Sequence, residues 1–501
     1  MIFCSLGEKR FSSYHFTYEF PSTYRLQTAV STLNFRHTNG TELDCGVVKI
    51  TPDLGEGASL AFSLTPLCLL AFIALVSVRK HLGGIHFRHF LDDDSVLATQ
   101  GPVWATVLDI TLFLRHMQFI FLSASMTVEY PGFYVPIISK LAWASLLFWR
   151  GPLDHGHSSP GIDGGMYVSN ATYGPDFMNQ MLGYPNMLNT LGNSVINLFI
   201  LLIPTFFLLS FLFVVASATP PAGRRSFWSI TKKAAGMTTG LGLCFFSVPL
   251  LSYMAYDLIL IGYLPNYRIA LAVFMLLLIV GAHHFLTYHV DDQIQTIRLP
   301  IDDDDDDIGP DRSTPNIDRF LKKLYRHLQH SFPLFQAVGV GGLQDHPLAQ
   351  VTVLAVCEVA ALVHAIFRVD EPFFALTTTY CSFVRLITAL LSISFTSSVT
   401  ETTKQWIGYT ILTLHGFVVL PGFFVKTGWQ LYRTAFDHAG IGDTSSSTIS
   451  SVRYAPSIEP DCRCTDTVPA ERCSGYPGLA LIYSLHSEPR GVCHGSASPP
   501  A

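Results

Sequence analysis

Long runs of apolar residues alternate with short polar gaps along most of this chain. Each run is long enough to cross a bilayer as a helix, which satisfies its own backbone hydrogen bonds. The pattern therefore predicts an all-α, polytopic integral membrane helix bundle with about eight or nine transmembrane helices. The eight clear runs are residues 60–78, 103–127, 194–218, 237–261, 269–290, 349–368, 372–395 and 407–425.

A ninth apolar stretch, residues 135–149, is ambiguous. It is only about 15 residues long and contains Lys140. A short span, a re-entrant segment and an interfacial helix therefore fit this stretch equally well. Whether it crosses the membrane decides the side on which every later loop lies.

The charges that flank the first run predict the orientation of the chain. Arg79 and Lys80 follow that run, whereas Glu42, Asp44 and Glu56 precede it. The positive-inside rule places the N-terminus in the lumen or outside and residues 79–102 in the cytosol.

Two glycosylation sequons, at Asn39 and Asn170, both face the lumen only if residues 135–149 do not cross. Eight crossings then leave the C-terminal tail in the lumen, although Lys426 and Arg433 flank the last run. Nine crossings that include residues 135–149 put the tail in the cytosol but expose the basic cluster at 224–233 outside. Both topologies stay open.

Composition and charge narrow the function class. Hydrophobic residues make up 49% of the chain and charged residues 14%, against about 25% charged in soluble domains, which leaves no room for a large soluble catalytic domain. The net charge of -6 owes much to the aspartate run 302–307, so it indicates no nucleic-acid partner.

Three regions follow from the hydropathy pattern. Residues 1–58 form a short N-terminal region, and residues 59–426 form the transmembrane domain, which includes a polar loop at 291–348. Residues 427–501 form a C-terminal tail rich in Ser, Pro and Gly, which predicts disorder.

Ionisable groups inside the runs are the candidate functional residues, because each costs several kcal/mol at mid-bilayer unless it is paired or hydrated. Glu358 and Arg385 lie about 12 and 15 residues from a turn near residue 370. Their depths therefore nearly match on two antiparallel helices, which predicts an ion pair or a shared polar cavity. Asp109 and His116 are seven residues apart and share one helix face, where they either line an interior path or only pack.

Enzymatic signatures do not occur at usable spacing. The sequence has no Ser, His and Asp set, no P-loop and no paired His box. Cys462-Arg463-Cys464 lacks metal-ligand spacing. We therefore expect no catalytic activity, no metal site and no cofactor.

Two stretches of the chain carry short, mostly aromatic motifs. The first stretch runs from Val103 to Trp149 and the second covers the last three apolar runs. The motifs are Gln118-Phe119-Ile120, Met126, Tyr130-Pro131, Tyr134, Leu141-Ala142-Trp143, Gln350 to Phe367, Pro372-Phe373, Arg385-Leu386-Ile387-Thr388, Phe395 and Lys404 to Gly408. Together they resemble the fungal TRP-like membrane proteins, also called the flavin carrier family.

The resemblance implies a lumenal, lipid-recognising ML-like domain, a bundle of about nine helices and a cytosolic tail. This chain departs from that pattern at its front: only residues 41–61 resemble the end of an ML-like domain, so residues 1–58 are read as its remnant. The Trp-Ser pair of the family is Trp143-Ala144 here.

The function implied by the resemblance is a channel or transporter in the endoplasmic reticulum or plasma membrane that moves cations such as calcium. The alternatives are a carrier of flavin nucleotide (FAD) into the endoplasmic reticulum, or a lipid-handling scaffold linked to the cell wall. The bilayer is the expected partner, and a lipid or sterol and a second copy of the chain are further candidates.

Overall fold

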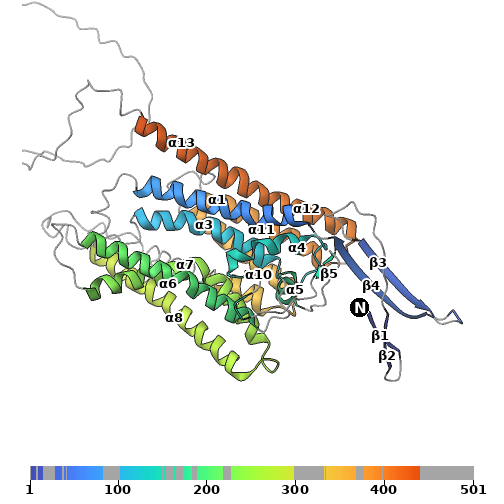
Figure 1. The fold of residues 1–501 in the computed structure, drawn as a ribbon. Helices are drawn as coiled ribbons and strands as arrows, with labels where there is room; N and C mark the ends of the chain where they lie inside the picture. The colour runs from blue at the N-terminus through green and yellow to red at the C-terminus, as the bar shows by residue number, and fades with distance from the viewer. Residues whose placement is uncertain are drawn as a thin grey trace, which may run out of the picture. The chain divides into compact units, whose positions relative to one another are not determined.

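The computed structural model contains a helical bundle preceded by short strands (Figure 1). The residues that it describes are 2–6, 10–14, 29–36, 39–40, 42–52, 54–82, 102–148, 151–153, 162–163, 166–167, 173–182, 189–217, 227–297, 332, 334–367, 377–397 and 399–439.

The N-terminal region forms antiparallel strands. β1 (Ile2–Leu6) pairs with β2 (Arg10–Tyr14), and β3 (Ala29–Arg36) pairs with β4 (Glu42–Pro52). Gly40, in the turn between β3 and β4, has a φ of 85°, a conformation that glycine adopts without strain. The short strands β6 (Met166–Tyr167) and β5 (Ile162–Asp163) extend this sheet in the order β3-β4-β6-β5. The all-α prediction omitted these strands.

Helices dominate from Glu56 onward, and every one of the eight predicted runs coincides with a helix. Six helices are long and apolar enough to cross a membrane, and two shorter apolar stretches occupy residues 266–282 and 347–363. The helices are α1 (Glu56–Leu82), α3 (Pro102–Ser123), α4 (Tyr134–Ile138), α5 (Gly174–Met181), α6 (Thr190–Ser217), α7 (Phe227–Ile259), α8 (Asn266–Ile297), α10 (Pro347–Phe367), α11 (Thr377–Ser392), α12 (Glu401–Phe417) and α13 (Lys426–Ala439), with 3-10 turns η2 (Ser139–Ser145) and η5 (Ile393–Thr396) and the π-helix η6 (Val418–Val425). These apolar helices indicate an integral membrane protein that contacts lipid.

The ambiguous stretch is not among the spanning helices. It forms the short α4 followed by the 3-10 turn η2, and most of its side chains are buried against α1, α3 and α7. Three side chains satisfy the carbonyls at its end: Gln118 Nε2 donates to Ala144 O at 2.9 Å, Tyr253 Oη to Ser145 O at 3.1 Å and Asn197 Nδ2 to Leu146 O at 2.9 Å. Non-helical backbone at membrane depth requires partners of this kind.

Contacts between loops show which helix ends lie at the same end of the bundle. Near the end of α3, the Thr127 amide donates to Gln350 Oε1 of α10 at 3.0 Å, and the Glu129 amide donates to the Phe395 carbonyl after α11 at 3.4 Å. At the opposite end of α3, Ser77 of α1 donates to Asp109 at 2.7 Å. We call the end of the bundle where α3 ends and α1 begins the N-side, and the opposite end the C-side.

The predicted polar loop at 291–348 is partly helical, which corrects that boundary. α8 continues to Ile297, and residues 334–342 form a helix that packs beside α10. A Cβ on Gly339 would lie 2.8 Å from a Val353 methyl group of α10, and one on Gly341 would overlap the backbone oxygen of Ser252 in α7. Glycines at these positions let three helices approach closely.

The last helix runs beyond its predicted end. α12, the π-helix and α13 follow one another without a break from Glu401 to Ala439 (Figure 1, orange). The predicted domain boundary at residue 426 is therefore wrong, because residues 427–439 continue the helix. Residues 440–501 lie outside the described residues.

Candidate functional site

The two charges singled out in the apolar runs contact each other. Arg385 Nε of α11 lies 3.1 Å from Glu358 Oε1 of α10, and their side chains are 12% and 0% exposed. The ion pair expected from their matched depths is therefore present. A buried charge without such a partner would cost several kcal/mol.

Neighbouring groups hold this pair in place. Gln336 Nε2, from the helix at 334–342, donates to Glu358 Oε1 at 2.8 Å. Arg385 Nη2 donates to Ser382 Oγ at 3.0 Å, and Arg385 Cζ lies 5.7 Å from the ring centroid of Phe119 in α3. Four helical segments thus meet around one arginine.

Two histidines lie next to this pair. The rings of His116 in α3 and His415 in α12 meet edge to face, with centroids 5.4 Å apart. Both residues are buried, and none of their four ring nitrogens has a hydrogen-bond partner. Phe119 links the histidines to the ion pair, because its ring lies 6.4 Å from that of His415. Buried polar atoms without partners are uncommon in proteins and call for a physical explanation.

Asp109 lies apart from His116, toward the C-side of the same α3 face. It lines a half-open recess, with an enclosed volume of only about 20 Å³, together with Ser77, Thr377, Lys426, Thr427 and Gln430. The Phe423 ring separates this recess from the histidines: it lines the recess, meets Phe113 edge to face at 5.0 Å and lies 6.4 Å from His116.

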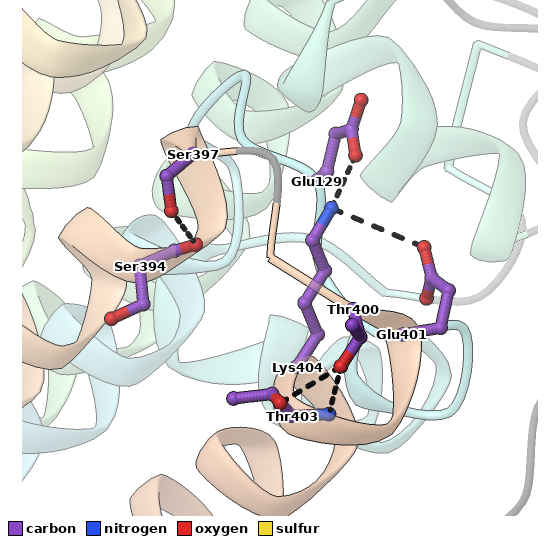
Figure 2. Close-up of polar contacts among 7 residues, drawn as sticks. All are labelled: Glu129, Ser394, Ser397, Thr400, Glu401, Thr403 and Lys404. Carbon is purple, nitrogen blue, oxygen red and sulfur yellow. Dashed lines mark hydrogen bonds and ion pairs between the residues drawn. The ribbon is translucent and has the colours of Figure 1, made fainter.

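A second polar set lies on the N-side, where α12 begins. Figure 2 shows Lys404 between two carboxylates: its Nζ contacts Glu129 Oε2 closely and lies 3.9 Å from Glu401 Oε1. The Thr400 hydroxyl accepts from the Thr403 amide and caps α12. Lys404 is buried, whereas the Glu129 side chain is 69% exposed, so this contact ties the α3–α4 loop to α12 at the surface.

The structure describes one of the two glycosylation candidates. Asn39 is exposed in the β3–β4 turn, and Asn170 lies outside the described residues. The nearest described residue after it, Tyr173, donates its hydroxyl to Asp345 at 2.9 Å, close to the start of α10. This hydrogen bond raises the pKa of Tyr173, and it holds Tyr173 itself on the N-side.

Three members of the site were not singled out from the sequence: His415, Gln336 and Lys426. The signal for His415 was present, since it lies within an apolar run just as His116 does. Gln336 fell in the predicted polar loop, where a glutamine is ordinary. Lys426 was noted only as a flanking charge.

Among the described residues, no group of three or more His, Cys, Asp or Glu side chains is placed to hold a metal ion. Comparison of the chain with models of known families, with curated proteins and with solved structures gave no match. The resemblance to the fungal TRP-like proteins therefore stays a prediction.

Proposed function

We propose that the protein is a multi-pass channel or transporter of the endoplasmic reticulum or plasma membrane that moves cations such as calcium. The observation that carries this proposal is the column of polar groups inside the bundle. It contains the ion pair Glu358–Arg385, the histidine pair His116–His415 and, beyond Phe423, the recess with Asp109.

The arrangement of the column supports a path better than it supports simple packing. Asp109 and His116 lie on one face of α3, about 10 Å apart at 1.5 Å per residue, and that face meets α12, the π-helix and α13. Intramembrane ionisable groups are costly and commonly mark ion or proton pathways. The four ring nitrogens without partners are available to a hydrated ion or a proton.

The aromatic pair Phe113–Phe423 interrupts the column between Asp109 and His116. Apolar constrictions of this kind gate channels by excluding water. Phe423 belongs to the π-helix, and π-helical turns occur frequently at functional sites. The described conformation therefore corresponds to a closed path.

On this proposal the chain crosses the membrane an odd number of times, and residues 135–149 are not a crossing. α1, α8 and α10 all begin on the N-side, whereas α13 ends on the C-side. An odd number of crossings places the N-terminus in the lumen and α13 in the cytosol. Arg79, Lys80, Lys426 and Arg433 then all lie on the cytosolic side, as the positive-inside rule requires.

Flavin nucleotide, the alternative cargo, fits this geometry less well. The recess beside Asp109 and the one beside Tyr256 have cavity volumes of about 20 and 10 Å³, room for about one water molecule each and far less than a dinucleotide needs. Arg385, the basic group that would bind a phosphate, is engaged by Glu358.

Replacement of Phe423 tests the path directly. Purified protein in liposomes, with a calcium indicator or FAD trapped inside, should move calcium faster than protein-free liposomes. Phe423→Ala should raise that flux several-fold, because it widens the constriction. Phe424→Ala is the matched control: the neighbouring ring is 54% exposed and lies 6.0 Å from Phe72 of α1.

Other results would contradict the proposal. Large-to-small changes in a core destabilise a protein by a few kcal/mol, so Phe423→Leu provides a milder second variant. If folded Phe423→Ala and Phe423→Leu both behave like Phe424→Ala, the path does not run along this column. FAD movement without calcium movement would replace the channel with the flavin carrier, and movement of neither would favour the lipid-handling scaffold.

A further inference from the structure

The recess on the C-side combines opposite charges with several neutral hydrogen-bonding groups. Asp109 comes from α3, and Lys426 comes from the junction of the π-helix with α13. Ser77 Oγ donates to Asp109 Oδ2 at 2.7 Å, and Lys426 Nζ donates to Thr377 Oγ1. Each charge is thus already oriented by a hydroxyl group.

The aromatic face of α13 sets the depth of this recess. Trp429, Tyr432 and Phe436 recur at helical spacing and are 57%, 51% and 58% exposed. Trp429 stacks on Tyr432 at 5.5 Å, and Arg433 lies over Trp429 at 5.7 Å. Tryptophan and tyrosine concentrate at membrane–water interfaces. The neighbouring face of α13, about 100° around the helix, carries Lys426 and Gln430 and therefore lines the recess at the level of the lipid headgroups.

We propose that this recess binds the headgroup of an ethanolamine phospholipid from the cytosolic leaflet. The phosphate would accept hydrogen bonds from Lys426 and Thr377, and the primary ammonium would donate to Asp109 and to the Gln430 side-chain oxygen. An anionic headgroup without an amine would leave Asp109 facing negative charge. A choline headgroup has no N–H to donate.

The inference depends on the membrane placement of the helices and not on transport. The test measures lipid binding and not ion flux. The lipid proposal can therefore be wrong while the transport proposal is right, and the transport proposal can be wrong while the lipid proposal is right.

The test is retention of lipid by the purified full-length chain. The protein is incubated in mixed micelles with equal amounts of ethanolamine, choline and glycerol phospholipids, and retained lipid is identified by native mass spectrometry. Ethanolamine lipid should be retained about tenfold over choline lipid, as expected for one charge-assisted hydrogen bond. Lys426→Gln and Asp109→Asn should each remove this preference.

A matched control separates the recess from general surface charge. Lys232→Gln removes an exposed lysine from the start of α7, on the same side of the bundle, and should keep the preference. If Asp109→Asn is recovered poorly, Thr377→Val removes the hydroxyl that orients Lys426 with little change in shape, and it should also weaken retention.

Several results would overturn the proposal. Equal retention of choline and ethanolamine lipids would exclude recognition of the ammonium, and a preference for glycerol phospholipid would indicate an anionic-lipid site. Competition by free phosphoethanolamine at the same concentration as the lipid would indicate a soluble ligand. Unchanged retention in folded Lys426→Gln would place the lipid elsewhere.

Discussion

At the scale of single residues, burial decides which charges matter. Glu358 is fully buried and is held by both Arg385 and Gln336, whereas Glu129 meets Lys404 with most of its side chain in solvent. Exposed ion pairs contribute about 0–1 kcal/mol. Removal of one partner of a buried pair costs about 3–5 kcal/mol, because the other charge is left uncompensated.

Thermal unfolding of the detergent-purified protein should show this difference. Glu358→Met should lower the unfolding midpoint strongly, since Arg385 then loses its buried counter-charge. The double variant Glu358→Met with Arg385→Met should recover much of the loss. Glu129→Gln should lower the midpoint less, because Lys404 keeps Glu401 at 3.9 Å as a second carboxylate. A double variant that is less stable than the single one would show that Arg385 has other strong partners.

At the scale of elements, the bundle depends on close contacts at glycines. The helix at 334–342 inserts between α7 and α10 because Gly339 and Gly341 present no side chain to Val353 and Ser252. This helix carries Gln336 to the ion pair. The close packing of this helix against α7 and α10 therefore also positions Gln336 beside the ion pair.

Adjacent glycines in this helix should respond differently to alanine. Gly341→Ala would push against the Ser252 backbone, so it should destabilise the protein by about 1–3 kcal/mol, the usual cost of overpacking. Gly342→Ala meets only ordinary contacts, at 3.7 and 3.8 Å, and should be neutral or stabilising by up to about 1 kcal/mol. The check is the unfolding midpoint of both variants under identical conditions. Similar losses in both would mean that the close approach to α7 is not what requires glycine.

At the scale of the whole molecule, the short α4–η2 segment decides which helix ends lie together, because it is too short to lead from one end of the bundle to the other. Since this segment begins beside the end of α3 and leads to the start of α6, both helix ends lie on the N-side. The sheet joins the same side, because β4, which precedes α1, pairs with β6 at Thr51 and Tyr167. The proposed orientation makes this side the lumen.

Glycosylation mapping tests that orientation. In a eukaryotic membrane system Asn39 and Asn170 should both be accessible to the glycosylation enzymes, and Asn39→Gln and Asn170→Gln should each remove one glycan from any site that is used. A new Asn-X-Thr sequon introduced after Ala439 should stay unmodified, because it lies in the cytosol. A glycan at that introduced site together with one at Asn170 would rule out an odd number of crossings.

Much of the bundle could be predicted from hydropathy, and the rest could not for identifiable reasons. The matched depths of Glu358 and Arg385 predicted their contact, because helix geometry alone fixes depth. The sequence left residues 135–149 ambiguous, because the carbonyl partners Gln118, Asn197 and Tyr253 come from distant helices. The helix at 334–342 was missed because Gln336 and the glycines make that segment look like a polar loop.

The π-helix at Val418–Val425 has a geometric consequence for α13. A π-helical turn holds one residue more than an α-helical turn needs, so conversion of this stretch to a regular α-helix would rotate everything beyond it by about 100°. Such a screw motion would carry Lys426 and Gln430 away from α3 and swing Trp429 toward the bundle. The wide turn thus holds one extra residue between the N-side part of the last helix, α12, and its C-side part, α13.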